Sequence, residues 1–301
     1  MKPNFLVAGV AKCGTTSLFY YLEQHPEVCI PKKETFFFIA DFYKKPSDDN
    51  RGRREPSRII FTKDQYDQLY HKCDGGAIGE VSTCYLHYYK SAIPQIKETL
   101  GDVPIIIVIR QPVARLISGY KHFIRLEKED LSLEAALKEE PHRAELNWDF
   151  MWQYKGLGLY ADGIAAFQNN FTNVKVILQE DLTDRPVATM QELFRFIGVN
   201  DTFTPDTSVK YNISDPQKNN LWFKYIFQNK NVKALLKPIA NIFTEEKTRR
   251  KIMHKFRKPS VQGENKLIID PELKEKLKDF YREDIVKTQQ LIQRDLSLWL
   301  K

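Results

Sequence analysis

Long hydrophobic runs are missing from this chain of 301 residues, and cysteine is scarce. No apolar stretch approaches the roughly 18 residues that a transmembrane helix needs, and no basic-then-apolar segment opens the chain, so we expect no membrane insertion and no secretory leader. The cysteines are too few for a disulfide framework and show no C-x-x-C spacing, which predicts neither a zinc site nor a redox pair. Together these absences predict a cytoplasmic protein without a bound metal; its four cysteines are Cys13, Cys29, Cys73 and Cys84.

The composition is that of a soluble globular protein, with 42% hydrophobic and 28% charged residues. The net charge of +7 and the pI near 9.0 favour anionic ligands without identifying them. Basic residues are spread among acidic ones and are not gathered on one stripe with stacked aromatic residues, so we do not expect nucleic-acid binding.

Apolar runs alternate with segments of helical periodicity along most of the chain. Strands are expected at 5–8, 77–81, 103–109 and 174–178, and the run at 103–109 is typical of a parallel strand buried on both faces. This alternation predicts an α/β fold of three layers, with a central, mostly parallel sheet flanked by helices. Helices are expected at 89–100, 112–123, 133–140, 159–169, 187–197 and 271–300.

We expect residues 1–301 to form a single domain, because no internal repeat or low-complexity tract divides the chain. Residues 40–76 are polar and charge-rich and are interpreted as a long surface insertion. Residues 203–265 are basic and irregular. These two segments are the candidates for the acceptor side of the protein.

A glycine-bounded loop follows the first strand and leads into a helix. Residues 9–17 read GVAKCGTTS, which fits the phosphate-binding pattern G-x-x-x-x-G-K-[ST] except that Thr15 stands where the lysine should be and Lys12 comes three places earlier. Backbone N–H groups and a helix N-terminus can hold a phosphate in such a loop without side chains. A Walker lysine serves the β- and γ-phosphates of a triphosphate, so its replacement argues against Mg-triphosphate chemistry.

A second motif begins where the buried strand ends, at Arg110, and continues into a helix that carries Ser118. Ligands of open α/β sheets bind at this edge of the sheet. An arginine and a serine hydroxyl there suit a second phosphate, with bidentate contacts from the guanidinium group. Without the first motif, Arg110 at the sheet edge and Ser118 in the helix are equally consistent with a structural role.

Taken together, the two motifs resemble the sulfotransferases that use 3′-phosphoadenosine 5′-phosphosulfate. The stretches K-E-T-F-F-F at 33–38, G-E-V-S-T-C-Y at 79–85, E-D-L at 180–182 and R-D-L-S-L-W at 294–299 extend the resemblance to the heparan-sulfate-type and bacterial members. The resemblance implies that one loop holds the 5′-phosphosulfate and that Arg110 and Ser118 hold the 3′-phosphate. The residues that it assigns to that loop are Lys12, Cys13, Gly14, Thr15, Thr16 and Ser17.

The resemblance also implies an in-line sulfonyl transfer with two catalytic residues. Lys12 would neutralise the charge that grows on the leaving phosphate oxygen, which is electrostatic stabilisation of a transition state. Glu34 matches the catalytic glutamate of the family, and the phenylalanines at 36–38 offer an apolar wall that would make a carboxylate a stronger base. Glu80 is either a second carboxylate in the cleft or an anchor for Lys12 or Arg110. The rival bases are His25, His71, His87 and His122.

The sequence departs from the heparan-sulfate members at one position, because Val81 stands where they have a lysine after the glutamate of the second strand. A small-molecule or glycan acceptor with a hydroxyl or an amine group is therefore expected, and the acceptor and the oligomeric state stay open. The alternative hypothesis is a nucleotide kinase or NTPase with a degenerate loop, which a magnesium requirement for nucleotide binding would reveal.

Overall fold

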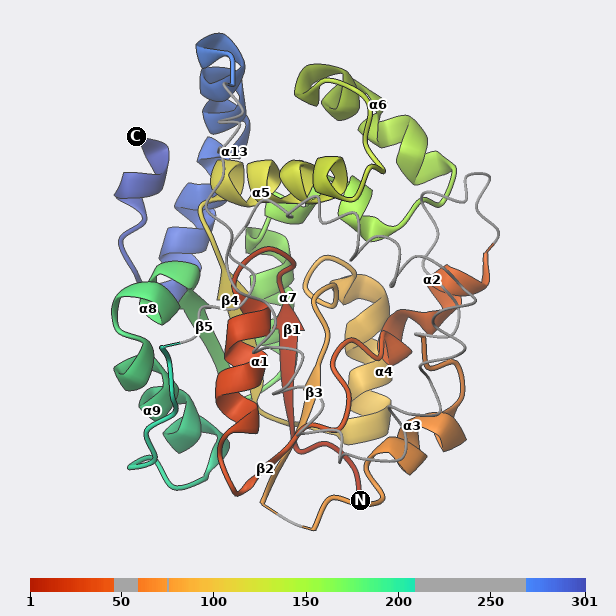
Figure 1. Cartoon of the computed structure of the whole chain (residues 1–301), viewed down its shortest axis with the longest axis vertical. Coiled ribbons are helices and arrows are strands. Elements are labelled where there is room, and N and C mark those ends of the chain that lie inside the picture. The colour runs from red at the N-terminus through yellow and green to blue at the C-terminus, as the bar shows by residue number, and fades with distance from the viewer. Residues whose placement is uncertain (46–58, 75, 209–268) are drawn as a thin grey trace, which may run out of the picture. The chain divides into compact units, whose positions relative to one another are not determined.

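The computed structural model describes residues 1–45, 59–74, 76–208 and 269–301. Their centre is a five-stranded sheet in the order β2-β3-β1-β4-β5, and every strand pair is parallel. Helices lie around this sheet (Figure 1), which confirms the predicted α/β class. The strands are β1 (Phe5–Gly9), β2 (Val28–Cys29), β3 (Ala77–Val81), β4 (Ile105–Ile109) and β5 (Val174–Leu178).

The central strands are apolar along their whole length because both faces of the sheet are covered. All residues of β1, β3 and β4 are buried, and β4 consists only of isoleucine and valine. β-Branched side chains suit such a strand because they fill both faces of the pleat. β1 lies between β3 and β4, with Leu6 opposite Glu80 on one side and opposite Ile105 on the other.

Helices cover both faces of the sheet. The helix α1 (Thr15–Glu23) joins β1 to β2 and lies in front of the sheet in Figure 1, whereas α4 (Tyr89–Leu100) joins β3 to β4 in the opposite direction across the sheet. Because parallel crossovers are right-handed, connections that run in opposite directions place their helices on opposite faces. α4 packs against α7 (Ala161–Asn170). The other elements are η1 (Phe37–Ile39), α2 (Ala40–Lys44), α3 (Lys63–Leu69), α5 (Pro112–Arg125), α6 (Leu133–Glu145), η3 (Phe150–Trp152), η4 (Gly156–Gly158), α8 (Gln179–Asp184), α9 (Pro186–Ile197), α13 (Pro271–Ile292) and η5 (Ser297–Leu300).

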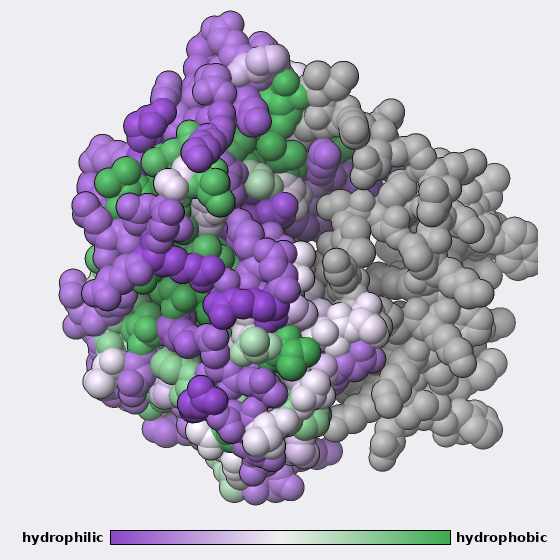
Figure 2. All heavy atoms as spheres, turned by 90° about the vertical axis from the view of Figure 1, so that its left-hand side faces the viewer, coloured by the Kyte–Doolittle hydropathy of each residue, from purple (hydrophilic) through white to green (hydrophobic). Residues whose placement is uncertain are grey.

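The helix α13 packs on the molecule through one stripe and exposes charged residues elsewhere. Its buried residues, Leu277, Tyr281, Ile285 and Thr288, recur at helical spacing. Its outer side carries lysine–glutamate pairs at i,i+4, and hydrophilic residues dominate this part of the surface at the top of Figure 2. The helix ends earlier than the predicted 271–300, because Gln293 adopts a left-handed conformation. Among the described residues, no helix is both long and apolar enough to cross a membrane.

Part of the segment predicted as a surface insertion belongs to the core. Tyr66 of α3 and Tyr70 directly after it are fully buried, and Phe37 stacks on Tyr66 with ring centroids 4.2 Å apart. Composition did not indicate that these tyrosines are buried, because charged residues surround them in the sequence. Residues 46–58 and most of 203–265 lie outside the described residues, so the single domain and its two insertions stay a prediction.

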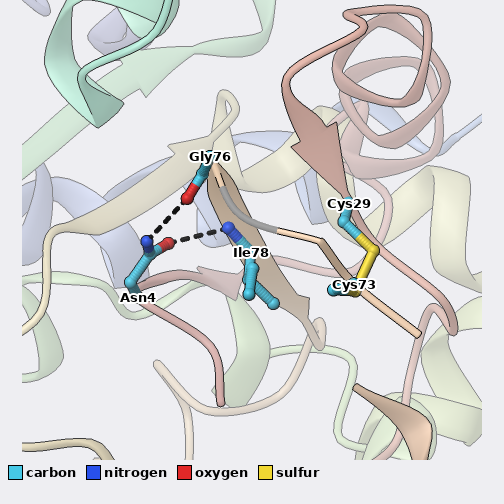
Figure 3. Close-up of a disulfide and its surroundings, with 5 residues drawn as sticks. All are labelled: Asn4, Cys29, Cys73, Gly76 and Ile78. Carbon is cyan, nitrogen blue, oxygen red and sulfur yellow. Dashed lines mark hydrogen bonds between the residues drawn. A yellow bond between two sulfur atoms is a disulfide. The ribbon is translucent and has the colours of Figure 1, made fainter. Parts of the chain in front are cut away.

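A disulfide joins Cys29, at the end of β2, to Cys73 after α3, with a Cα–Cα distance of 5.9 Å (Figure 3). The scarcity of cysteine predicted no disulfide framework, but it did not reveal this single bridge, because two cysteines that are 44 residues apart in sequence meet only in the folded chain. The side chain of Asn4 also stabilises this region, because its Nδ2 donates to the carbonyl of Gly76 and its Oδ1 accepts from the N–H of Ile78. The disulfide thus fastens the edge strand β2 to the turn that precedes β3.

We expect Cys73→Ser to lower the free energy of unfolding by about 2–4 kcal/mol, because the bridge closes a long loop and so restricts the unfolded chain. Denaturant unfolding of the wild type with and without dithiothreitol, beside the Cys29→Ser/Cys73→Ser variant, measures this loss. The reductant should leave the double variant unchanged. Titration of the denatured, unreduced protein should count two thiols, from Cys13 and Cys84; a count of four would contradict the bridge.

Candidate active site

The candidate site residues come together because parallel strands present their carboxyl ends at one edge of the sheet. β1 leads to Lys12, β3 leads to Thr83, and β4 leads to Arg110. Val10 donates to the carbonyl of Val108, and Ala11 donates to the carbonyl of Thr83, so the loop after β1 is bonded to both neighbouring strands. This edge is where an open α/β sheet binds its ligands.

The loop after β1 ends in a helix N-terminus that faces this edge. Gly14 is the N-cap of α1 with φ 88°, a conformation that favours glycine. The first bond within the helix runs from Leu18 N–H to the Gly14 carbonyl, so the amide groups of Thr15, Thr16 and Ser17 lie ahead of it at the positive end of the helix dipole. A Cβ on Gly14 would lie 3.3 Å from the side chain of Gln179, which shows how closely α8 packs on the loop.

Lys12 is half-buried in this loop, and its backbone is left-handed with φ 72°. Burial, together with the positive charges of Arg125, Arg115, Arg110 and Lys33 in that order, lowers the pKa of Lys12 to about 8. A lysine held among four other cations is suited to an anionic ligand, which would offset their repulsion. The thiol of the neighbouring Cys13 is unreactive, because burial raises its pKa to about 12.

The arginines around Lys12 come from distant parts of α5 and from the residue directly after β4, while Lys33 comes from the loop that carries Glu34. Arg110 donates to the Lys12 carbonyl at 3.4 Å, and Arg125 at the end of α5 donates to His122 Nδ1 at 3.0 Å. Arg115 is fully buried and donates to the Tyr154 carbonyl at 3.1 Å. The sequence motifs had not singled out Arg115 or Arg125, because their relation to Lys12 depends on the path of α5. Ser118 lies on the same helix and is partly exposed.

Glu34 lies close to this loop through Thr83. Thr83 Oγ1 donates to Glu34 Oε1 at 3.3 Å, while the Thr83 carbonyl accepts the N–H of Ala11, the residue before Lys12. Lys33 Nζ lies 3.1 Å from the same carboxylate oxygen. The structure therefore brings Glu34 and the loop of Lys12 to one threonine, which no motif had indicated.

The phenylalanines after Glu34 differ from the expected apolar wall, because their rings extend the core. Phe37 and Phe38 pack on Tyr66, and Phe36 packs on Tyr43 and Phe150. The Glu34 carboxylate instead makes polar contacts, with Lys33 Nζ and Thr83 Oγ1.

Glu80 lies in the core and contacts neither Lys12 nor Arg110 by a hydrogen bond. Its carboxylate accepts from hydroxyl groups, one of which belongs to Thr35 next to Glu34. The suggestion that Glu80 anchors Lys12 or Arg110 is not supported by these contacts.

The four histidines lie in different surroundings. His25 is buried with its Nε2 2.9 Å from the Asn200 carbonyl, and His87 bonds Gln153 at 2.8 Å, while burial lowers its pKa. His71 is exposed. His122 is the histidine bonded to a cation of the group around Lys12.

Within residues 1–45, 59–74, 76–208 and 269–301, no three His, Cys, Asp or Glu side chains gather closely enough to hold a metal ion. Metal independence stays a prediction.

The comparisons with known proteins agree with this geometry. The family model described as "Sulfotransferase family" matches residues 3–204, which is more than half of the chain. A crystal structure of a sulfotransferase from Alicyclobacillus acidocaldarius has a TM-score of 0.75 and 30% sequence identity, with all of both chains covered.

Two curated relatives are more distant. The mouse heparan sulfate glucosamine 3-O-sulfotransferase 3B1 is 24% identical over 67% of this chain and 47% of its own length. The membrane-associated sulfotransferase kil1 of Dictyostelium discoideum is 28% identical over 43% of this chain and 25% of its own length. The chain thus spans between a quarter and about half of these relatives. Because the family model matches more than half of the chain, and the solved sulfotransferase is 30% identical over all of it, the chain belongs to the sulfotransferase family.

Proposed function

We propose that this protein moves a sulfonyl group from 3′-phosphoadenosine 5′-phosphosulfate to a hydroxyl or amine acceptor by in-line transfer. The observation that carries the proposal is the position of Thr83, whose carbonyl accepts from Ala11 in the loop at 9–17 and whose hydroxyl donates to Glu34. In this proposal the loop at 9–17 is the phosphate loop. A donor held in the loop and an acceptor held at Glu34 would therefore meet at one point, as a direct transfer requires.

The residues present suit an anionic nucleotide donor. Lys12 precedes α1, and the positive charges of Lys33, Arg110, Arg115 and Arg125 act on it and contribute to its lowered pKa. We assign the 5′-phosphosulfate to Lys12, Cys13, Gly14, Thr15, Thr16 and Ser17, and the 3′-phosphate to Arg110 and Ser118. When bound, this donor supplies the activated sulfonyl group.

In this proposal, two side chains act on the reacting atoms. Lys12, in its protonated form, neutralises negative charge on the leaving phosphate oxygen. Glu34 accepts the acceptor's proton as a general base, while Thr83 and Lys33 hold its carboxylate in place. Because Lys33 also contacts that carboxylate, the proton transfer would take place beside a fixed positive charge.

The names of the relatives bear on the chemical class of the acceptor. The mouse relative is named for a heparan sulfate glucosamine, which favours a glycan, whereas Val81 departs from the lysine of the heparan-sulfate type. Val81 is fully buried, and its carbonyl accepts the N–H of Glu34. We therefore propose a small-molecule or glycan acceptor and no nucleic acid. A mass-spectrometric screen for the gain of one sulfonate would identify it.

The disulfide bears on the compartment in which the protein folds. The cytoplasmic prediction rested on scarce cysteine and on the lack of a leader, but the Cys29–Cys73 bridge favours an oxidising compartment. Thiol counting on protein extracted from its native source under alkylating conditions would decide between them.

The proposed function is tested by calorimetry of 3′-phosphoadenosine 5′-phosphate binding with and without EDTA. Equal affinity in both conditions is expected, because Lys12 and the arginines supply the positive charge that Mg²⁺ gives to a triphosphate site. A strict Mg²⁺ requirement would instead favour the kinase or NTPase hypothesis.

Arg110→Ala should weaken binding of 3′-phosphoadenosine 5′-phosphate by about 2 kcal/mol or more, because a charge-assisted contact to the 3′-phosphate is lost. Adenosine 5′-phosphate, which lacks that group, is the matched ligand and should lose much less. The same calorimeter measures both. Equal losses for the two nucleotides would remove Arg110 from the 3′-phosphate site.

A further inference from the structure

Glu80 is a fully buried carboxylate surrounded by hydroxyl groups. Thr35 Oγ1, Ser82 Oγ and Tyr85 Oη donate to its Oε1 at 2.6, 2.8 and 2.9 Å, and Tyr70 Oη donates to its Oε2 at 2.7 Å. No lysine or arginine of the described residues forms an ion pair with it. Four O–H donors therefore take the place of water around this carboxylate, which would otherwise be costly to bury.

The two tyrosines remain donors at every ordinary pH. Burial raises the pKa of Tyr70 and of Tyr85 well above the usual range, and the negative charge of Glu80 raises both further. Tyr66 packs on Tyr70, with ring centroids 5.1 Å apart, and burial together with the negative charge of Glu80 raises the pKa of Tyr66 as well. The Glu80 cluster, defined as Glu80 with Thr35, Tyr70, Ser82 and Tyr85, is thus a fixed network of hydroxyl donors around one carboxylate.

The Glu80 cluster continues into the loop that carries Glu34. Thr35 Oγ1 accepts the N–H of Phe37, and Ser82 Oγ accepts the N–H of Phe36, both at 3.3 Å. Glu34 and Phe36, on either side of Thr35, have φ of 62° and 54°. A left-handed conformation is unfavourable for residues other than glycine, so contacts outside the loop must hold it in this shape.

From these contacts we infer that Glu80 is a positioning residue, which fixes loop 33–37 through Thr35 and Ser82 and so holds Glu34 beside the phosphate loop. Glu80 does not touch the reacting atoms in this arrangement. The inference rests on the proposed role of Glu34 for its catalytic consequence, but the ordering of the loop can be measured separately.

The first test uses Thr35→Val, which keeps the shape of the side chain and removes its hydroxyl, beside Thr35→Ser, which keeps the hydroxyl. Hydrogen exchange of peptides that cover 33–37 should be at least about tenfold faster in Thr35→Val and near wild type in Thr35→Ser, because the N–H of Phe37 and the Glu80 contact depend on that oxygen. Glu80→Gln should also speed exchange. Unchanged exchange in folded Thr35→Val and Glu80→Gln would overturn the inference.

A buried tyrosine outside the cluster provides a matched control. Tyr70→Phe removes a hydroxyl that donates to Glu80, whereas Tyr120→Phe removes a hydroxyl that donates to the Leu131 carbonyl. Exchange of loop 33–37 should rise in Tyr70→Phe and stay unchanged in Tyr120→Phe. Equal effects of the two variants would point to general loosening of the core and would contradict a specific role for Glu80.

A double-mutant cycle separates this inference from the role of Glu34. Turnover of 3′-phosphoadenosine 5′-phosphosulfate with the acceptor found by the screen should fall at least about tenfold in Thr35→Val, with unchanged affinity for 3′-phosphoadenosine 5′-phosphate. Added to Glu34→Gln, Thr35→Val should cause no further loss. Additive losses would mean that Thr35 does not act through Glu34. Full activity of Glu34→Gln would refute the proposed base, and the exchange data would still decide the role of Glu80.

Discussion

Glu34→Gln is expected to lower turnover by roughly 10²- to 10⁴-fold while fold and donor affinity stay as in the wild type. Glutamine keeps the size of the side chain and can still accept from Thr83, but it cannot take the proton of a hydroxyl acceptor. Because Glu34 is positioned near the phosphate loop by Thr83 rather than belonging to it, nucleotide binding should be spared. Steady-state kinetics on the screened acceptor and calorimetry with 3′-phosphoadenosine 5′-phosphate measure the two quantities.

The control for this variant is Glu98→Gln, which makes the same chemical change at an exposed position of α4 and should leave turnover unaltered. With an amine acceptor, the defect of Glu34→Gln should shrink as the pH rises, because a growing fraction of the amine is already deprotonated. Full activity of Glu34→Gln on a hydroxyl acceptor at neutral pH would refute the assignment. The next candidate for the general base would then be His122, which is bonded to Arg125 of the cation group around Lys12.

Lys12→Met is expected to have two opposite effects, a loss of turnover of about 10²- to 10³-fold and a gain in the stability of the ligand-free protein. The gain follows from the pKa of Lys12, which is about 8 in the folded protein and 10.5 in the unfolded chain, mainly because burial disfavours its charge. Removing this charge at pH 7 should raise the free energy of unfolding by about 1–3 kcal/mol. Denaturant unfolding beside steady-state kinetics measures both effects.

The pH dependence of the Lys12→Met gain gives a check on its cause. Below pH 8 Lys12 is protonated in both states, so its charge opposes folding in full and the gain is largest. Between pH 8 and 10.5 the unfolded chain binds more protons than the folded one, so wild-type stability rises with pH and the gain fades. Lys72→Met, at an exposed position, should change stability by less than about 0.5 kcal/mol. A pH-independent gain would rule out the buried charge as its source.

Local signals in the sequence predicted four of the five strands and most of the longer helices, but not the two-residue strand β2. The strands at 77–81 and 174–178 have the predicted bounds, and the predicted helix at 89–100 is α4. Apolar runs and helical periodicity are properties of neighbouring residues, so they can be recognised without knowledge of the fold. The glycine at position 14 was read correctly as the end of the loop, since a left-handed residue before a helix needs glycine there.

The sequence by itself determined the family resemblance, because the two phosphate motifs and their order are local, and it indicated Lys12 and Glu34 as candidates. Only the tertiary structure decided how they meet. Thr83 contacts Glu34 and the loop of Lys12, Cys29 is bonded to Cys73, and Tyr70 donates to Glu80. Each of these contacts joins separate strands or loops of the fold. Such contacts depend on strand order and on the path of helices between the strands, and residue spacing along the chain carries no signal of either.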